Sequence, residues 1–98
     1  MKPAKMLEEL EEIAPTLGVK VSYEKLDSSV GVGGMCRVKG KLRIIVDKRA
    51  TTHERLATLG AGLSTLDVAE TKLSKPVRQL FAYYQQQAQQ LQQLRAAS

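Results

Sequence analysis

The chain has 98 residues, of which 43% are hydrophobic and 26% charged, and this balance excludes an intrinsically disordered protein. The length suits one domain around one core, so we interpret residues 1–98 as a single small domain. No run approaches ~18 consecutive apolar residues, so we expect no membrane partner. The net charge of +5 favours either a polyanionic partner or pairing between the acidic N-terminal segment and the basic middle.

Apolar residues at helical spacing predict a first helix over residues 3–17. Pro15 is expected to bend its last turn, and Gly18 stands where a helix C-cap is expected. The N-terminal segment is acidic and has no apolar stretch of the secretory type, so we do not expect it to be a secretory signal. From Val19 to Glu24 the period changes to two, which predicts a half-buried strand.

Two more strands are predicted at Met35–Val38 and Leu42–Asp47, joined by a tight Lys39-Gly40 turn. The segment "LRIIVD" is the strongest strand signal and should be the most buried strand. Residues 27–34, rich in serine and glycine, predict a flexible connection before these strands.

A second helix should begin at about Thr52, because Thr51 and Glu54 have the spacing of a capping box. Gly60 and Gly62 lie inside this helix, where each glycine costs about 1 kcal/mol relative to alanine. Close packing of another element against that face would explain their presence.

The last helix should start near Pro76, and its glutamine-rich end should continue it, since glutamine is a good helix former. Apolar residues thin out along this end, so residues 86–98 are predicted to project as a helical extension. The resulting element order is α-β-β-β-α-α. We therefore predict an α+β fold with a three-stranded antiparallel sheet and helices on one face.

The dipeptide His53-Glu54 is typical of the start of a helical zinc motif, which needs a second histidine four residues later. Ala57 occupies that position, and the chain has no other histidine. We interpret His53 as a residue of the first helical turn that either faces solvent or makes a local cap contact, and we expect no metal, no cofactor and no catalytic residue.

The segment "IIVD" followed by "ERLATLGAGLSTL" resembles the core of the ImmA/IrrE-type small zincin metallopeptidases, over roughly residues 40–66. That family has a strand of the type I-x-V-N before a helix of the type R-F-T-x-A-H-E-x-x-H. With Arg55 on the family arginine, Gly60 and Ser64 replace the ligand histidines, and Ala61 replaces the catalytic glutamate. The resemblance implies a degenerate, metal-free zincin-like scaffold without the HExxH motif.

Cys36 is the single cysteine, which excludes an internal disulfide and fits a reducing compartment. We therefore expect a cytoplasmic location. Cys36 shares a strand face with Val38, so we predict a buried, inert thiol.

The hairpin "CRVKGKLR" is the first candidate binding surface, because its basic residues alternate with apolar ones and several should project from one side. The residues of this possible polyanion site are Arg37, Lys39, Lys41 and Arg43. Nucleic acid is the corresponding partner. The alternative is an edge hairpin that its lysines keep from aggregating.

The last helix is the second candidate surface. Its possible interface consists of Tyr84, Ala88, Leu91 and Leu94, which could pair with a second copy or cover the first helix of the same chain. We therefore predict a non-enzymatic interaction module that binds a protein partner or itself. A small basic nucleic-acid-binding protein is the alternative.

Overall fold

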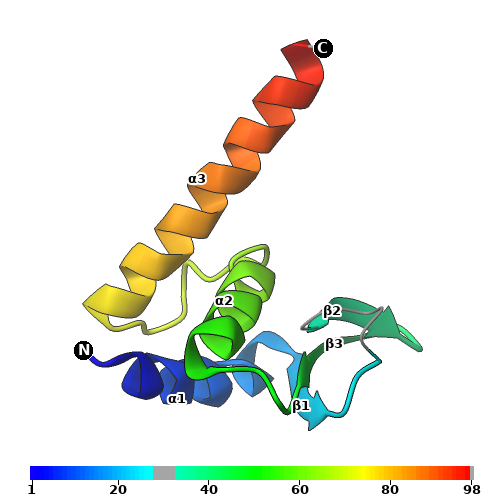
Figure 1. The fold of residues 1–98 in the computed structure, drawn as a ribbon. Coiled ribbons are helices and arrows are strands. Elements are labelled where there is room, and N and C mark those ends of the chain that lie inside the picture. The colour runs from blue at the N-terminus through cyan, green and yellow to red at the C-terminus, as the bar shows by residue number, and fades with distance from the viewer. Residues whose placement is uncertain (28–32, 98) are drawn as a thin grey trace.

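The computed structural model describes residues 1–27 and 33–97 as an α+β fold whose elements follow the order α1-η1-β1-β2-β3-α2-α3 (Figure 1). The predicted order of helices and strands is therefore confirmed. Residues 28–32 of the predicted flexible connection lie outside the described residues.

Helix α1 spans Pro3–Ile13 and is followed by a short 3-10 helix, η1, at Pro15–Leu17. Proline cannot donate the backbone hydrogen bond of a continuing α-helix, so the chain tightens into the 3-10 turn at Pro15. Gly18 then adopts the left-handed conformation, with φ of 77°, as its predicted role in a C-cap requires.

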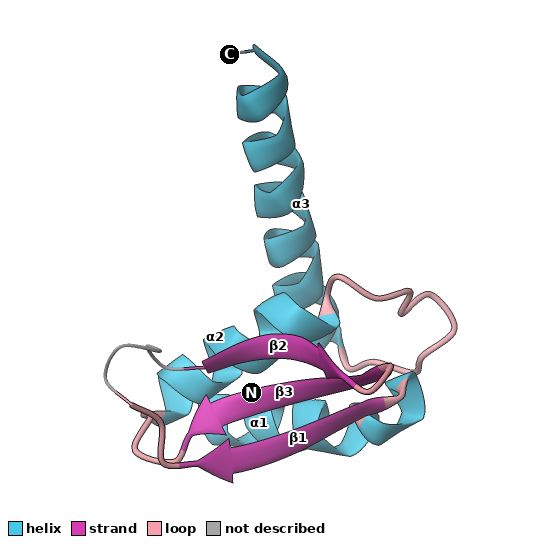
Figure 2. Cartoon of the chain, turned by 90° about the vertical axis from the view of Figure 1, so that its right-hand side faces the viewer, coloured by secondary structure: helices cyan, strands magenta, loops and turns pink. Residues whose placement is uncertain are grey.

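The sheet contains β1 (Val19–Glu24), β2 (Gly33–Val38) and β3 (Lys41–Asp47) in the order β1-β3-β2 (Figure 2). Strand β2 is antiparallel to β3, but β1 is parallel to β3, so the prediction of a purely antiparallel sheet is wrong. Alternation of apolar and polar residues is the same in both kinds of pairing, so it does not reveal strand direction. Strands β1 and β2 are not neighbours in the sheet, because β3 pairs with both of them. Strand β3 thus lies in the middle.

The cross-strand register divides the sheet into two faces. Ile44 of β3 is opposite Val21 of β1 and Met35 of β2, and these side chains point toward the helices. Figure 2 shows α1 and α2 behind the sheet, with the other face open. Ile44 and Val46 are fully buried, which confirms β3 as the most buried strand.

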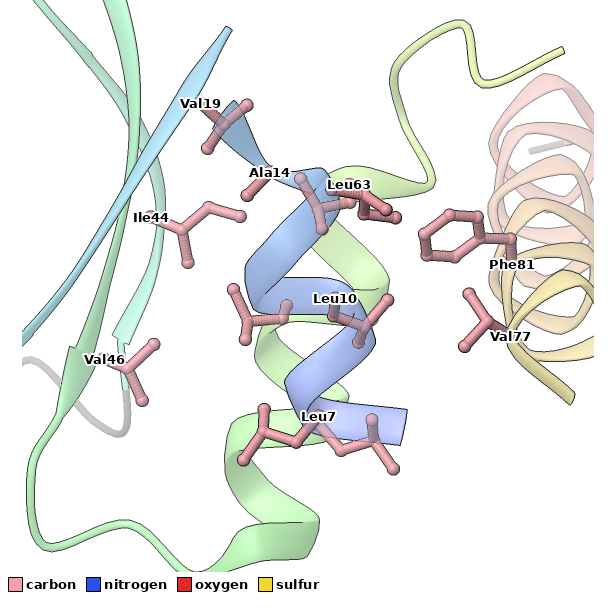
Figure 3. Close-up of a cluster of buried hydrophobic side chains, with 12 residues drawn as sticks. Leu7, Leu10, Ala14, Val19, Ile44, Val46, Leu63, Val77 and Phe81 are labelled. Carbon is pink, nitrogen blue, oxygen red and sulfur yellow. The ribbon is translucent and has the colours of Figure 1, made fainter. Parts of the chain in front are cut away.

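One hydrophobic core joins the helices to the helix-facing side of the sheet (Figure 3). Helix α2 (Thr52–Leu63) lies between the sheet and α3, and it packs along α1. The buried side chains are Leu7, Leu10, Ile13, Ala14, Val19, Ile44, Val46, Leu56, Leu59, Leu63, Val77 and Phe81.

Helix α3 spans Lys75–Ala97 and has two different environments along its length. Val77 and Phe81 are buried against the body of the domain, whereas all residues from 85 to 95 are exposed. Figure 1 shows the C-terminal half of α3 extending away from the other elements. None of the described helices combines the length and apolar character needed to cross a bilayer.

Candidate functional site

The hairpin between β2 and β3 carries the four basic residues of the predicted polyanion site. Lys39 and Gly40 have φ angles of 51° and 77°, the backbone that a tight two-residue turn between twisted strands requires. Arg37 lies on the helix-facing side of the sheet, whereas Lys41 and Arg43 lie on the open face. The four side chains are thus divided between the two faces of the ribbon.

A groove at this end of the sheet brings the four residues together. It encloses about 1020 Å³ and is lined by the hairpin turn, the start of β1 and the end of α1. A fifth basic residue, Lys20, also lines it. Sequence reasoning missed Lys20, which reaches the groove because β1 lies parallel to β3 with Lys20 opposite Arg43. We call this hollow the basic groove.

Arg43 contributes a hydrogen-bond donor that is not satisfied within the described part of the chain. Its Nη2 lies 3.7 Å from Oε2 of Glu24, which is within ion-pair distance, and both side chains are partly exposed. Its Nε is buried and has no hydrogen-bond partner among residues 1–27 and 33–97. A buried N–H without an acceptor is unfavourable, so an anionic group bound beside Arg43 would be stabilised.

Tyr23 is held in place at the wall of the basic groove. Its hydroxyl donates a 2.6 Å hydrogen bond to Glu11, and the guanidinium of Arg55 lies 4.6 Å from the centre of its ring. Burial and the hydrogen bond to Glu11 raise the pKa of Tyr23 above its ordinary value. Tyr23 therefore acts as a fixed, neutral part of the wall.

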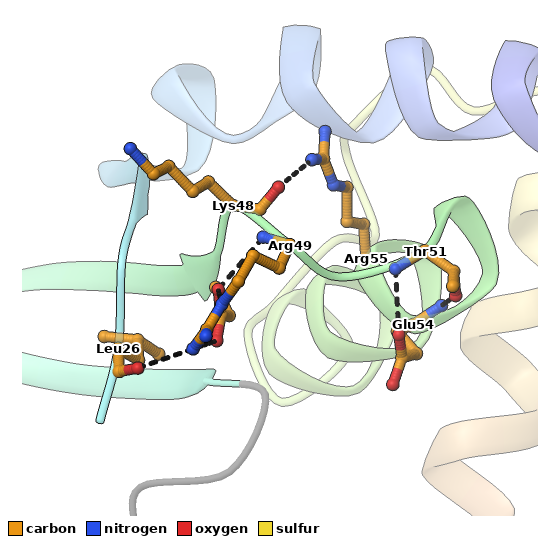
Figure 4. Close-up of polar contacts among 7 residues, drawn as sticks. Leu26, Lys48, Arg49, Thr51, Glu54 and Arg55 are labelled. Carbon is orange, nitrogen blue, oxygen red and sulfur yellow. Dashed lines mark hydrogen bonds and ion pairs between the residues drawn. The ribbon is translucent and has the colours of Figure 1, made fainter. Parts of the chain in front are cut away.

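Arg49 ties the loop between β3 and α2 to Leu26, just beyond the end of β1 (Figure 4). Asp47 holds the Arg49 side chain in this position. The carboxylate of Asp47 accepts hydrogen bonds from the backbone N–H of Arg49 at 2.9 Å and from its Nη2 at 2.8 Å. The same Nη2 donates to the carbonyl oxygen of Leu26 at 2.7 Å. The hydrogen bonds from the Arg49 side chain and backbone lower the pKa of Asp47 from 3.8 to about 2.

This lowered pKa predicts a pH dependence of stability. Because the folded protein holds Asp47 ionised more strongly than the unfolded chain does, its contribution is complete above about pH 4 and is lost as the pH falls toward 2. We expect Asp47→Asn to be less stable than the unmodified protein at pH 7, with the difference disappearing near pH 2. Urea unfolding at several pH values measures it. The control, Glu70→Gln, removes an exposed carboxylate and should leave the curve unchanged, and a constant deficit of Asp47→Asn at every pH would contradict the prediction.

Arg55 and a capping box fix the start of α2 (Figure 4). The side chain of Arg55 donates to the carbonyl oxygens of Ala50 at 3.0 Å and Lys48 at 2.7 Å. The Thr51 hydroxyl accepts from the Glu54 backbone, and the Glu54 carboxylate accepts from the Thr51 backbone, so the predicted capping box is confirmed.

The positions that align with zinc ligands in the resemblance have other structural roles. Gly60 lies against the ring of Tyr84, where an added Cβ would come within 2.9 Å. Ser64 caps the end of α2, and its hydroxyl donates to the carbonyl oxygen of Ala61 at 2.9 Å. His53 is exposed in the first turn of α2, as predicted. Within residues 1–27 and 33–97, no three histidine, cysteine, aspartate or glutamate side chains gather to form a metal-binding group.

Cys36 is exposed, so the prediction of a buried thiol is wrong. It does share a face with Val38, which is also exposed, but this is the open face of the sheet. The helices cover the other face, and a strand pattern alone does not show which face they will cover.

The predicted interface on α3 consists of half-buried Tyr84 and exposed Ala88, Leu91 and Leu94. Leu91 and Leu94 are 58% and 68% exposed. The first three of these residues also line a shallow groove of about 480 Å³ between the end of α2 and α3. None of the three residues beyond Tyr84 is covered by the described part of the chain.

Comparisons with known proteins found no matching protein family, no matching curated protein and no matching solved structure. The resemblance to the ImmA/IrrE-type peptidases therefore stays a prediction.

Proposed function

We propose that this chain is a non-enzymatic interaction module that associates with a second copy of itself through the projecting half of α3. The observation that carries the proposal is the exposure of Leu91 and Leu94 on a helix that leaves the body of the domain. Tyr84, Ala88 and Leu91 follow each other at spacings of four and three residues, which suits a helix-to-helix seam. Leu94 lies on the same side one turn further.

The composition of α3 supports a second copy as the occupant of this surface. Residues 79–94 contain no charged residue of either sign, although the whole chain has a net charge of +5. Two such helices do not repel each other when they pair. Glutamine side chains both donate and accept hydrogen bonds, so glutamines on one copy can pair with glutamines on the other. A symmetric dimer uses such a self-complementary surface.

The stability of an isolated helix gives a second line of support. A helical segment shorter than about 12–15 residues is only marginally stable in water without packing. Ala88, Leu91 and Leu94 are exposed, so the described part of the chain does not cover the apolar side chains of this half of the helix. Pairing with a second copy would bury the leucines and stabilise this half of the helix.

The test is the mass of the protein in solution, measured by light scattering over a concentration series. We expect the 10.8 kDa chain to approach twice its mass as concentration rises. Leu91→Gln/Leu94→Gln should remain a monomer, because it removes the apolar side chains and leaves the rest of the helix unchanged. Far-UV circular dichroism should show more helix at concentrations where the dimer forms.

The matched control is Gln86→Ala/Gln93→Ala, which changes two side chains on the opposite side of α3. This variant should associate as the unmodified protein does. A protein that stays monomeric at every concentration, or equal loss of association in both variants, would contradict the proposal.

A further inference from the structure

The basic groove at the hairpin end of the sheet is a second surface, and it lies on elements other than α3. Its five cationic side chains are Lys20, Arg37, Lys39, Lys41 and Arg43. Glu11 is the acidic residue among the described lining residues, and its carboxylate already accepts the Tyr23 hydroxyl. The lining therefore has an excess of positive charge, which attracts an anionic ligand.

The walls between the cations are largely apolar. Val19, Val21, Val38 and Leu42 line the same groove, and Val38 is 39% exposed. Val21 and Leu42 are also partly exposed, so a ligand that carries only charges would leave these two side chains and Val38 in contact with water. A ligand that alternates apolar and acidic groups can cover the apolar walls and reach the cations together.

The lining does not favour nucleic acid bases. Single-stranded nucleic acid is usually held by aromatic rings on which bases stack. Tyr23 is the aromatic residue among the described lining residues, but its ring already lies against Arg55 and its hydroxyl against Glu11. Duplex nucleic acid is also a poor match for the groove. Its backbone is convex and would not reach the walls of a hollow.

The position of β1 favours an extended peptide. Strand β1 is an edge of the three described strands, and among these it pairs with β3 alone. An extended peptide that lies along the groove presents alternate side chains to opposite sides, so its acidic and apolar residues can face different lining groups. Residues 18–21, which include the first half of β1, line the basic groove.

We propose that the basic groove binds an extended acidic segment of a partner protein, with its carboxylates on cations that line the groove and its apolar side chains on the partly exposed walls. The buried Nε of Arg43, which has no acceptor in the described residues, donates to one of these carboxylates. If the chain also pairs through α3, each dimer presents two such grooves and binds a multivalent partner more tightly than one groove does.

The experiment uses the full chain and a fluorescent peptide of about eight residues, alternating glutamate and valine, which spans about 26 Å when extended. Binding is measured by fluorescence anisotropy at about 0.15 M salt, where weak long-range attraction is screened. We expect Lys39→Glu/Lys41→Glu to weaken binding about tenfold or more, since each reversal replaces an attraction by a repulsion. A peptide alternating lysine and valine should not bind.

Two further variants make the test specific. Lys72→Glu/Lys75→Glu changes the net charge equally, outside the basic groove, and should alter the affinity by less than about twofold. Arg43→Lys retains the charge but lacks the buried Nε, and it should weaken binding several-fold. Because Lys39 and Lys41 are exposed, their variant should fold, and circular dichroism checks this.

Three outcomes would overturn the proposal. Equal weakening by the two double variants would show attraction by net charge alone. Unchanged affinity of Arg43→Lys would remove the role of the Arg43 donor. Tighter binding of an oligonucleotide than of the acidic peptide, lost in Lys39→Glu/Lys41→Glu, would assign the groove to nucleic acid instead. None of these outcomes depends on whether α3 associates, since the variants leave that helix unchanged or differ only at its first residue.

Discussion

Phe81→Ala should lower the free energy of unfolding by about 3–5 kcal/mol, the usual cost of truncating a buried phenylalanine to alanine. Phe81 is 2% exposed and, with Val77, forms the part of α3 that enters the core (Figure 3). A domain of this size is stabilised by roughly 5–15 kcal/mol in total, so the loss is a large share. Urea unfolding followed by far-UV circular dichroism measures it.

The control for this prediction is Tyr83→Ala, two residues further along α3. Tyr83 is 53% exposed, so its truncation should cost less than about 1 kcal/mol. Similar losses in the two variants would mean that Phe81 is not an anchor of α3. Because the proposed self-association needs α3 to be held on the domain, Phe81→Ala should also weaken the dimer.

Features that depend on neighbouring residues could be predicted from the sequence. The capping box of Thr51 and Glu54, the Lys39-Gly40 turn and the C-cap at Gly18 each follow from a few adjacent residues. Structure in these segments is decided locally, so the sequence is sufficient. The predicted bounds of the strands match the observed ones closely for the same reason.

Features that depend on distant segments could not be predicted in the same way. The parallel pairing of β1 with β3 joins strands that are distant in sequence, and alternation of apolar and polar residues does not encode strand direction. Alternation correctly places Cys36 on one strand face with Val38, but the exposure of that face depends on where α1 and α2 lie. Periodicity identifies a face, and only the assembled layers determine what covers it.

The basic groove illustrates both cases. Arg37, Lys39, Lys41 and Arg43 could be named from the hairpin sequence alone. Lys20 could not, because it joins them only through the register of β1 on β3. The Nε of Arg43, which has no acceptor among residues 1–27 and 33–97, and the fixed position of Tyr23 also depend on neighbours that are distant in sequence. These nonlocal features could not be inferred from the hairpin sequence alone.

Gly60→Leu is the second substitution with a large expected effect, and it should lower the free energy of unfolding by about 1–3 kcal/mol, as overpacking usually does. A Cβ at Gly60 would lie 2.9 Å from Cε2 of Tyr84 and 3.1 Å from Cδ2 of Leu80. The further atoms of a leucine would have to displace one of these side chains. Leucine is a better helix former than glycine by almost 1 kcal/mol, so any loss must come from packing. Chemical unfolding of the variant provides the measurement.

Ala57→Leu is the matched control, because it adds a leucine on an exposed position of the same helix and should change stability by no more than about 0.5 kcal/mol. If Tyr84 moves aside without cost, Gly60→Leu will be more stable than the unmodified protein, and the close approach of α2 and α3 will be refuted. If the packing is as tight as the distances indicate, the displaced Tyr84 will also change the seam that begins the proposed interface. Gly60→Leu should then weaken self-association at concentrations where Ala57→Leu does not, which links a glycine inside a helix to the surface that α3 presents.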